Sequence, residues 1–261
     1  MRPVPVLMYH HINHHKGDMV TITPEVFEGQ MEYLYRAGYR TLKIAELIAC
    51  INGELTLTQK AVVVTFDDGW LDNYMYAFPI LKKYKINATV FLITNRVENA
   101  SQNATKIPSF IPTHEESKSL IEKGEAHKVV LNWKLIKEMS NSGMTEFYSH
   151  TKSHAKCNSL PEKELMEELK ESREIIEKRL GSPCPYFCWP YGKYNGLAVN
   201  VAKKTGYKAI FTTNHGIVKT GSDPFAINRI IVKDSIAWFK KRMVVYTNTI
   251  LSSLYLKIKK K

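Results

Sequence analysis

Short apolar runs alternate with longer stretches of helical periodicity along this chain. Runs typical of buried strands lie at residues 4–9, 39–42, 61–66, 88–93, 145–149, 186–189, 208–212 and 227–232. Helical patterns lie between them, at residues 24–37, 44–51, 132–141, 161–180 and 197–205, and another helix follows the 61–66 run through Tyr84. Strand followed by helix, many times over, is typical of parallel βαβ units.

This alternation predicts an α/β fold with one domain, in which seven or eight units close into an irregular barrel. No internal repeat or linker divides the chain. Residues 94–130 are the longest interruption, and their polar, irregular sequence predicts a lid, a binding loop or a locally disordered segment. We therefore expect a catalytic barrel over residues 1–234 and a basic helix or tail over residues 235–261.

Composition narrows the class of protein. The chain has 261 residues, of which 44% are hydrophobic and 24% charged, as in ordinary globular proteins. The net charge of +12 is concentrated at the end, because the last 22 residues hold 7 of the 37 Lys and Arg residues and no acid follows Ser235. A charge surplus in a tail argues against a nucleic-acid groove, so we expect no nucleic-acid partner.

The ends of the chain carry weaker signals. The start, MRPVPVLMYHH, lacks the basic-then-apolar order of a signal peptide, and no run of 18 apolar residues predicts a spanning helix. A cytoplasmic protein, or one on the cytoplasmic membrane face, follows if the sequence is complete; an extracytoplasmic one follows if a signal segment was removed. The tail is either a last barrel helix or a peripheral contact with an anionic membrane. We expect a monomer.

Two adjacent carboxylates, Asp67 and Asp68, follow the apolar run in AVVVTFDDGW, residues 61–70. A lone Asp-Gly corner is most often a turn. In a parallel barrel, however, strand C-terminal ends gather the active residues. Neighbouring side chains at a strand end point in different directions, so one carboxylate can hold a cation while the other stays free as a base.

A histidine pair follows a second strand, in SHTKSH at residues 149–154. The spacing of His150 and His154 predicts that both imidazoles share one face of a helical turn. Together with Asp68 they would give three protein ligands and an open position, which is the pattern of a catalytic metal site. Zinc held in this way lowers the pKa of its water to about 7, and Asp67 could take that proton.

Two further segments lie at predicted strand ends. In YFCWPYGKYN, residues 186–195, the aromatic residues could form a sugar-binding rim, and the backbone N–H near Tyr191 could stabilise an oxyanion. In LMYHHIN, residues 7–13, His10 ends the first strand and could protonate a leaving group. A plain turn and a solvent-exposed histidine cluster are the alternatives. Candidate substrate contacts are Trp70, Trp189 and Pro190, although a tryptophan is also a common core residue.

TFDDG, SHTxxH and the PYG turn, in this order, resemble the polysaccharide deacetylase family, the family four carbohydrate esterases with the chitooligosaccharide deacetylase homology domain. The resemblance covers residues 4–232 and implies a distorted (β/α) barrel, with about seven parallel strands here. It implies Asp67 as catalytic base, Asp68, His150 and His154 as ligands of a divalent metal, and Tyr191 as oxyanion donor. The metal would be zinc, with cobalt or nickel as alternatives.

The start LMYHHI and the CWPYG motif look most like the biofilm poly-N-acetylglucosamine deacetylases, where the histidine of the opening YH motif is the general acid; this maps to His10. The sequence also departs from the family. Cys188 stands where chitin and peptidoglycan deacetylases have an Arg, and their late Leu-x-His motif is missing.

Three functions remain open from the sequence. The first is metal-dependent hydrolysis of N-acetyl groups on a GlcNAc-containing polysaccharide, with metal-activated water and an Asp base. The second is an O-acetyl esterase that uses the same site. The third is an inactive glycan-binding module, against which the intact Asp67, Asp68, His150 and His154 argue.

Overall fold

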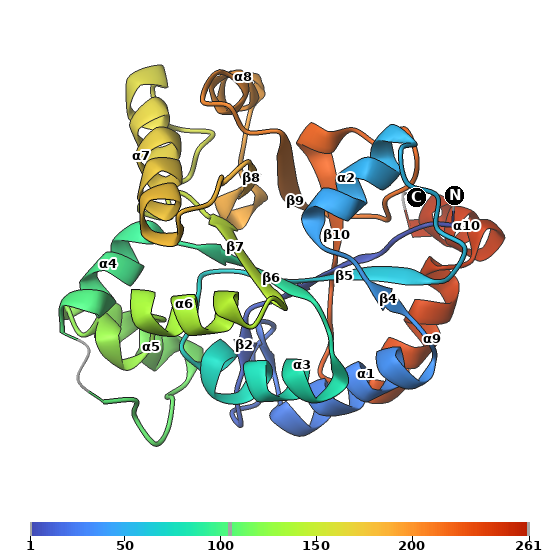
Figure 1. Cartoon of the computed structure of the whole chain (residues 1–261), viewed down its shortest axis with the longest axis horizontal. Helices are drawn as coiled ribbons and strands as arrows, with labels where there is room; N and C mark the ends of the chain where they lie inside the picture. The colour runs from blue at the N-terminus through green and yellow to red at the C-terminus, as the bar shows by residue number, and fades with distance from the viewer. Residues whose placement is uncertain (1, 104–105, 260–261) are drawn as a thin grey trace.

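The chain folds as an α/β barrel in the computed structural model, which describes residues 2–103 and 106–259 (Figure 1). The ten strands within these residues are β1 Val6–Tyr9, β2 His11–Ile12, β3 Thr21–Ile22, β4 Arg40–Thr41, β5 Ala61–Phe66, β6 Ala88–Leu92, β7 Thr145–Ser149, β8 Tyr186–Cys188, β9 Ala209–His215 and β10 Ile227–Ile231. The α-helices are α1 Pro24–Arg36, α2 Ile44–Asn52, α3 Phe78–Tyr84, α4 Thr94–Gln102, α5 His114–Glu122, α6 Trp133–Asn141, α7 Glu162–Leu180, α8 Gly196–Lys204, α9 Ile236–Tyr246 and α10 Thr249–Lys259.

Seven parallel strands close the barrel. They pair in the order β1, β10, β9, β8, β7, β6, β5, and β5 returns to pair with β1, with Val6 beside Val63 and Tyr9 beside Phe66. The short β4 pairs with the beginning of β5, and β2 pairs with β3 in a separate ribbon. The predicted single-domain barrel of about seven parallel strands is therefore confirmed.

Side chains alternate between the inside and the outside of the barrel, because successive residues of a strand face opposite sides. On β5, Val63 belongs to a cluster that includes Phe91 and Phe211, whose strands are not neighbours, so this cluster fills the barrel interior. Val64 and Phe66 belong to the outer core beneath the helices. Asp67 lies two residues after Thr65 and four after Val63, so its side chain points into the barrel as theirs do.

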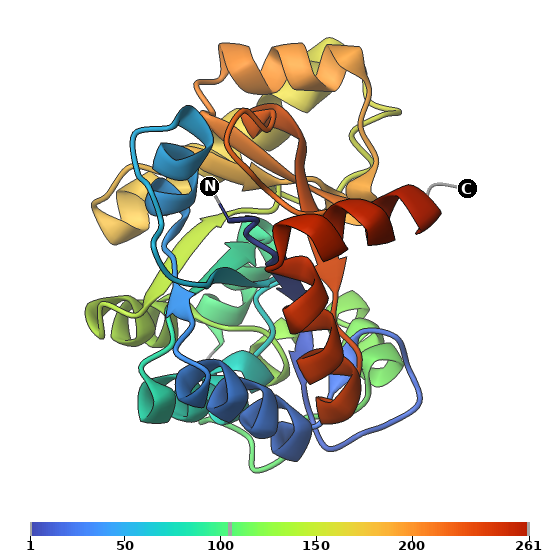
Figure 2. The same cartoon turned by 90° about the vertical axis from the view of Figure 1, so that its right-hand side faces the viewer.

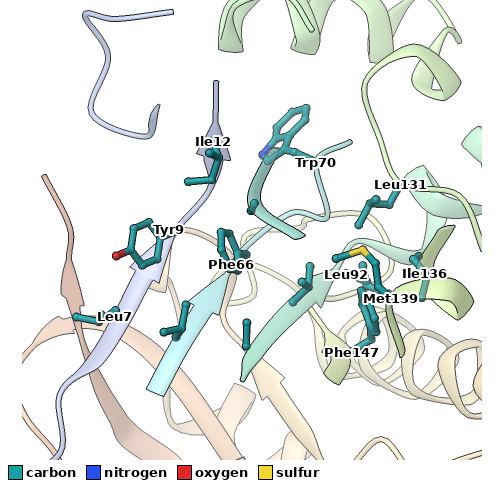
Figure 3. Close-up of a cluster of buried hydrophobic side chains, with 14 of the residues drawn as sticks. Leu7, Tyr9, Ile12, Phe66, Trp70, Leu92, Leu131, Ile136, Met139 and Phe147 are labelled. Carbon is teal, nitrogen blue, oxygen red and sulfur yellow. The ribbon is translucent and has the colours of Figure 1, made fainter. Parts of the chain in front are cut away.

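The outer core is the larger of the two clusters. Figure 3 shows part of it, with Tyr9, Phe66 and Trp70 near one another and Leu92, Met139 and Phe147 further along. Helix α1 lies between α3 and α9 on one side of the barrel (Figures 1 and 2). All six residues of β5 are buried, because both faces of this strand are covered. Its sequence therefore shows no alternation of apolar and polar residues.

The 94–130 segment is more ordered than the sequence suggested. It contains α4, α5 and a 3₁₀ turn at Ala126–Lys128, so the expectation of an irregular stretch is wrong for most of it. Helix α5 begins with a capping box, in which Thr113 and Glu116 each bind the other's backbone N–H. A cap of this kind lets a short polar sequence start a helix that packing then stabilises.

Two helices form the end of the chain. Phe239, Met243 and Tyr246 of α9 are buried, whereas Ile250 and Leu254 of α10 are exposed. Lys260 and Lys261 of the basic tail lie outside the described residues. Within the described ranges, no helix combines the length and the apolar character that crossing a membrane requires.

Candidate active site

The C-terminal ends of four barrel strands meet at a cavity of about 200 Å³. β1 delivers His10, β5 delivers Asp67 and Asp68, and β7 delivers His150, with His154 in the loop that follows. The loop after β8 adds Tyr191. The structure therefore brings together side chains that are far apart in sequence, at the edge where parallel barrels gather their active residues.

Three of these residues point at one another. Asp68 Oδ1 lies 3.3 Å from His154 Nε2 and 3.6 Å from His150 Nε2. The same oxygen is buried and has no hydrogen-bond partner among the described residues. An unpaired buried carboxylate oxygen is costly unless a ligand satisfies it. One oxygen and two imidazole nitrogens facing a common point are a donor set that fits a divalent metal ion.

Hydrogen bonds orient both imidazoles for this task. His150 Nδ1 lies 2.8 Å from the backbone oxygen of Cys188, and His154 Nδ1 lies 3.0 Å from the Tyr191 hydroxyl. A carbonyl oxygen only accepts, so His150 carries its proton on Nδ1 and has its lone pair on Nε2, while the Tyr191 contact fixes the His154 ring; both rings present Nε2 toward Asp68. Burial lowers the pKa of both imidazoles, that of His154 to about 3, and so favours their neutral, ligating form.

The prediction that His150 and His154 share a helical turn is wrong. Residues 150–154 form an irregular loop, in which Thr151 and His154 have φ of 67° and 68°. Asp68 (φ 72°) and Tyr191 (φ 56°) are also left-handed, so four of the five described non-glycine residues with positive φ lie at this site. Such backbone costs energy and tends to persist where function requires it.

Asp68 is positioned by the turn that follows β5. Gly69 has φ of 71°, and a Cβ there would lie 2.8 Å from a Leu92 methyl group, so only glycine fits this corner. The turn brings the indole Nε1 of Trp70 to 3.1 Å from Asp68 Oδ2, to which it donates a hydrogen bond. Trp70 thus holds one oxygen of the carboxylate and leaves the other facing the two imidazoles.

Asp67 is held by a residue that the sequence analysis missed. Arg229 of β10 donates from Nη1 to Asp67 Oδ1 and from Nη2 to Oδ2, both at 2.7 Å. Its Nε donates to the backbone oxygen of Thr212 at 2.8 Å, and the whole side chain is buried. Burial alone would raise the pKa of Asp67, but the charge and hydrogen bonds of Arg229 outweigh it and hold that pKa below its usual value.

Arg229 also contacts Cys188, the residue at which the sequence departs from the family that it resembles. Its Nη2 lies 3.0 Å from Cys188 Sγ, so a guanidinium from β10 lies beside this position. Arg229 could have been noticed in the sequence, because INRII places one charged residue within a predicted strand whose other residues, apart from Asn228, are apolar. A buried arginine of this kind needs a carboxylate partner.

A second group, Asp67, His150 and Cys188, also has metal-ligand atoms close together. It is the poorer metal site for two reasons. Both oxygens of Asp67 are engaged by Arg229, and burial raises the pKa of the Cys188 thiol well above its usual value, which disfavours the thiolate that metals require. All four cysteines are free.

The remaining predicted residues lie at the cavity or beside it. His10 Nε2 lies 3.8 Å from Asp67 Oδ2, and its side chain is partly exposed. Tyr191 lines the cavity and its ring is exposed. The expectation of a substrate contact is wrong for Trp189 and Pro190, which do not line the cavity, whereas Trp70 does line it. Both tryptophan rings are buried, Trp189 stacked on Tyr194, and Pro190 is buried as well.

Three cavity residues come from the 94–130 segment and were not expected. Arg96 of α4 and His114 and Lys118 of α5 line the same cavity as the metal-ligand set. Arg96 lies over the Trp70 ring, and His114 is in hydrogen-bond contact with His11. Their sequence surroundings are polar and carry no motif, so the predicted lid or binding loop gave no indication of which residues reach the cavity.

Comparison with known families agrees with this geometry. A family model described as polysaccharide deacetylase matches residues 54–210, which is more than half of the chain and includes Asp67, Asp68, His150, His154 and Tyr191. The chain belongs to the polysaccharide deacetylase family. It is therefore a hydrolase with the barrel of the carbohydrate esterases.

Relatives of this polysaccharide deacetylase span most of its length. The Bacillus subtilis protein YxkH, which carries the family name, is 29% identical over 88% of the chain and 71% of its own length. The poly-β-1,6-N-acetyl-D-glucosamine N-deacetylase of Staphylococcus aureus is 27% identical over 82% of the chain and 68% of its own length.

Solved structures show the same fold. The Streptococcus pyogenes deacetylase PplD, in complex with acetate, superimposes with a TM-score of 0.76 and 28% identity, over 92% of this chain and 98% of that one. The structure of IcaB from Ammonifex degensii gives a TM-score of 0.72 and 25% identity, over 92% of this chain and 98% of that one.

Proposed function

We propose that this polysaccharide deacetylase removes N-acetyl groups from a GlcNAc-containing polysaccharide in a metal-dependent hydrolysis. The observation that carries the proposal is the unpaired, buried Oδ1 of Asp68, which faces the Nε2 atoms of His150 and His154. A second carboxylate, Asp67, lies in the same cavity and is held ionised by Arg229. One binding carboxylate and one proton acceptor are what metal-assisted amide hydrolysis needs.

Asp68, His150 and His154 would hold the ion, for which we propose zinc; cobalt and nickel also accept one oxygen and two imidazole ligands. A divalent ion at this place would polarise the acetyl carbonyl and lower the pKa of water. The protein's own residues would carry out the remaining steps.

Asp67 acts as general base and takes a proton from the attacking water. Arg229 occupies one lone-pair direction on each oxygen, which fixes the carboxylate plane and leaves further lone pairs open to the cavity. His10 lies on the Oδ2 side of Asp67 and donates a proton to the departing nitrogen. The backbone N–H of Tyr191 stabilises the developing oxyanion.

The substrate is inferred from two relatives named as poly-β-1,6-N-acetyl-D-glucosamine N-deacetylases, one from Staphylococcus aureus and one from Escherichia coli. This chain spans 36% of the length of the Escherichia coli protein. An O-acetyl ester could be hydrolysed at the same site, since the C–O bond of an ester is easier to cleave than the C–N bond of an amide. Acetate release from a panel of N- and O-acetylated glycans tests the proposal. Release from N-acetylated oligomers that stops with a chelator supports it, and release only from O-acetylated glycans would contradict it.

For the basic tail at residues 235–261 we propose peripheral contact with an anionic membrane surface. Ile250, Leu251 and Leu254 of α10 are exposed apolar residues, Lys257 follows, and no acid lies after Ser235. Substituting these three apolar residues by Gln tests this without removing α9, whose side chains are buried. Flotation with anionic vesicles that is lost in the triple variant supports the contact, and equal flotation contradicts it.

A further inference from the structure

A buried chain of three side chains leads from the protein interior to the cavity. Asp72 Oδ2 lies 2.6 Å from His11 Nδ1, and His11 Nε2 lies 3.1 Å from His114 Nδ1. Asp72 and His11 have no exposed surface, whereas His114 lines the cavity beside Asp68 and Trp70. The His11 ring stacks on Trp70 with 4.2 Å between ring centroids, which fixes its plane. None of these residues has a role in the hydrolysis described above.

The hydrogen bonds of this chain determine where the imidazole protons lie. A carboxylate can only accept, so His11 carries its proton on Nδ1 and donates it to Asp72. With this single proton, the His11 ring has a lone pair on Nε2, to which His114 donates from Nδ1. Burial lowers the pKa of His114, so the second ring is neutral. One proton on each ring satisfies both hydrogen bonds.

We propose that the Asp72–His11–His114 chain fixes His114 as an acceptor in the cavity, where its bare Nε2 receives a hydrogen bond from a sugar hydroxyl group of the substrate. His114 is then a specificity-determining residue, and His11 and Asp72 are positioning residues that act through it. The identity of the hydroxyl donor rests on the proposed function, because a glycan is the ligand that brings hydroxyl groups to this cavity.

The chemistry of the cavity explains why an acceptor is useful there. Arg96 and Lys118, the other residues contributed by α4 and α5, can only donate hydrogen bonds. Asp67 and Asp68 are engaged by Arg229 and by the metal-ligand set. A site built to accept from one particular hydroxyl group rejects an analogue that lacks it, because its own buried group would stay unpaired.

A substitution at Asp72 can reverse the direction of the hydrogen bonds from Asp72 through His11 to His114 without changing a residue that lines the cavity. Asn73 Nδ2 donates to Asp72 Oδ1 at 3.0 Å and to the backbone oxygen of His10 at 2.8 Å, so its orientation is fixed. In Asp72→Asn the amide oxygen would face Asn73 and the amide NH₂ would face His11. His11 would then carry its proton on Nε2, and His114 would present Nε2–H, a donor. Asn in place of the Asp of an Asp–His pair imposes the wrong tautomer in serine proteases as well.

The first experiment needs no substrate. Nitrogen-15 NMR of histidine-labelled, metal-loaded protein at pH 8 reads the tautomer of His114, assigned by the signals that disappear in His114→Asn. The proposal predicts an unprotonated Nε2 in the wild type and a protonated Nε2 in Asp72→Asn. A protonated Nε2 in the wild type overturns the proposal. This result is independent of whether the glycan assignment is right.

The second experiment measures kinetics on N-acetylated oligosaccharides and on analogues that lack one ring hydroxyl group. His114→Asn keeps an amide near the Nδ1 position but loses the Nε2 acceptor, and we expect KM to rise about 10-fold with metal content unchanged. One deoxy analogue should be discriminated by the wild type and no longer by His114→Asn. Glu122→Gln, at the exposed end of the same helix, is the control and should match the wild type. Unchanged discrimination in His114→Asn overturns the proposal, and no turnover of any glycan by the wild type would refute the proposed function instead.

Discussion

Arg229 and Asp67 form a bidentate ion pair across the interior of the barrel, with both N–O distances at 2.7 Å. The two residues lie 162 positions apart in the sequence; Arg229 is on β10 and Asp67 directly follows β5, and these two strands are not neighbours. The pair has two consequences: it neutralises a charge that is buried in the barrel, and it orients the carboxylate that we propose as the general base. Its energetic role and its catalytic role can be separated by substitution.

Arg229→Met should leave the Asp67 carboxylate buried without a counter-charge. Removing one partner of a buried ion pair costs about 3–5 kcal/mol, which urea unfolding would measure. Burial would then raise the pKa of Asp67, so the acid limb of the pH–rate profile should move to higher pH. Arg36→Met, which removes an exposed pair with Glu32, is the control and should change stability by less than about 1 kcal/mol. Equal destabilisation in both variants would contradict the assignment.

Asp68→Asn should abolish high-affinity metal binding, because the amide brings no negative charge to the two imidazoles. Purified wild-type protein is expected to hold about one divalent ion per chain, measured by elemental analysis after dialysis. Asp67→Asn should hold as much metal as the wild type, which makes it the matched control. Full metal content in Asp68→Asn would refute the ligand set.

Trp70→Phe removes the indole hydrogen bond to Asp68 Oδ2 while keeping an aromatic ring in the core. Loss of such an outer hydrogen bond typically lowers metal affinity by about 10–100-fold, so competition with a chelator should show a shift in this range. Trp238→Phe, on the partly buried face of α9, should bind metal like the wild type. An unchanged affinity in Trp70→Phe would show that the hydrogen bond does not support the ligand.

Burial raises the pKa of Cys157 and of Cys184 to about 12 each. Because the thiol pKa is about 8.5 in the unfolded chain, the folded state favours the neutral thiol. This contribution to stability is complete below pH 8.5 and is lost as the pH rises toward 12. Iodoacetamide at pH 9 should therefore label these cysteines only after denaturant is added; labelling of the native protein at the denatured rate would contradict their burial.

Structural features that depend on residues close together in the sequence could be predicted. The strand at residues 145–149 was predicted with its observed bounds, and the residues after β1, β5 and β7 do meet at one cavity. What failed was the local geometry of His150 and His154, because their loop has positive φ at two non-glycine residues, and residue type alone does not reveal such strain.

Contacts across long separations were not predictable from one sequence. Arg229 reaches Asp67 through the closed barrel, and His114 reaches His11 over 103 residues through the packing of α5 against the site. Tryptophans were expected at the sugar, yet Trp189 fills the core, since large rings gain more from burial than from exposure. These arrangements arise from tertiary packing, which no local pattern encodes.

The most direct test of the account compares acetate release by wild-type protein and by Asp67→Asn, both loaded with zinc and verified to hold equal metal. The substrate is an N-acetylglucosamine oligomer, and the wild type is also assayed after metal removal. The account predicts that removal abolishes release, that added zinc restores it, and that Asp67→Asn stays inactive with its metal in place. Release that survives metal removal, or turnover by Asp67→Asn at the wild-type rate, would contradict it.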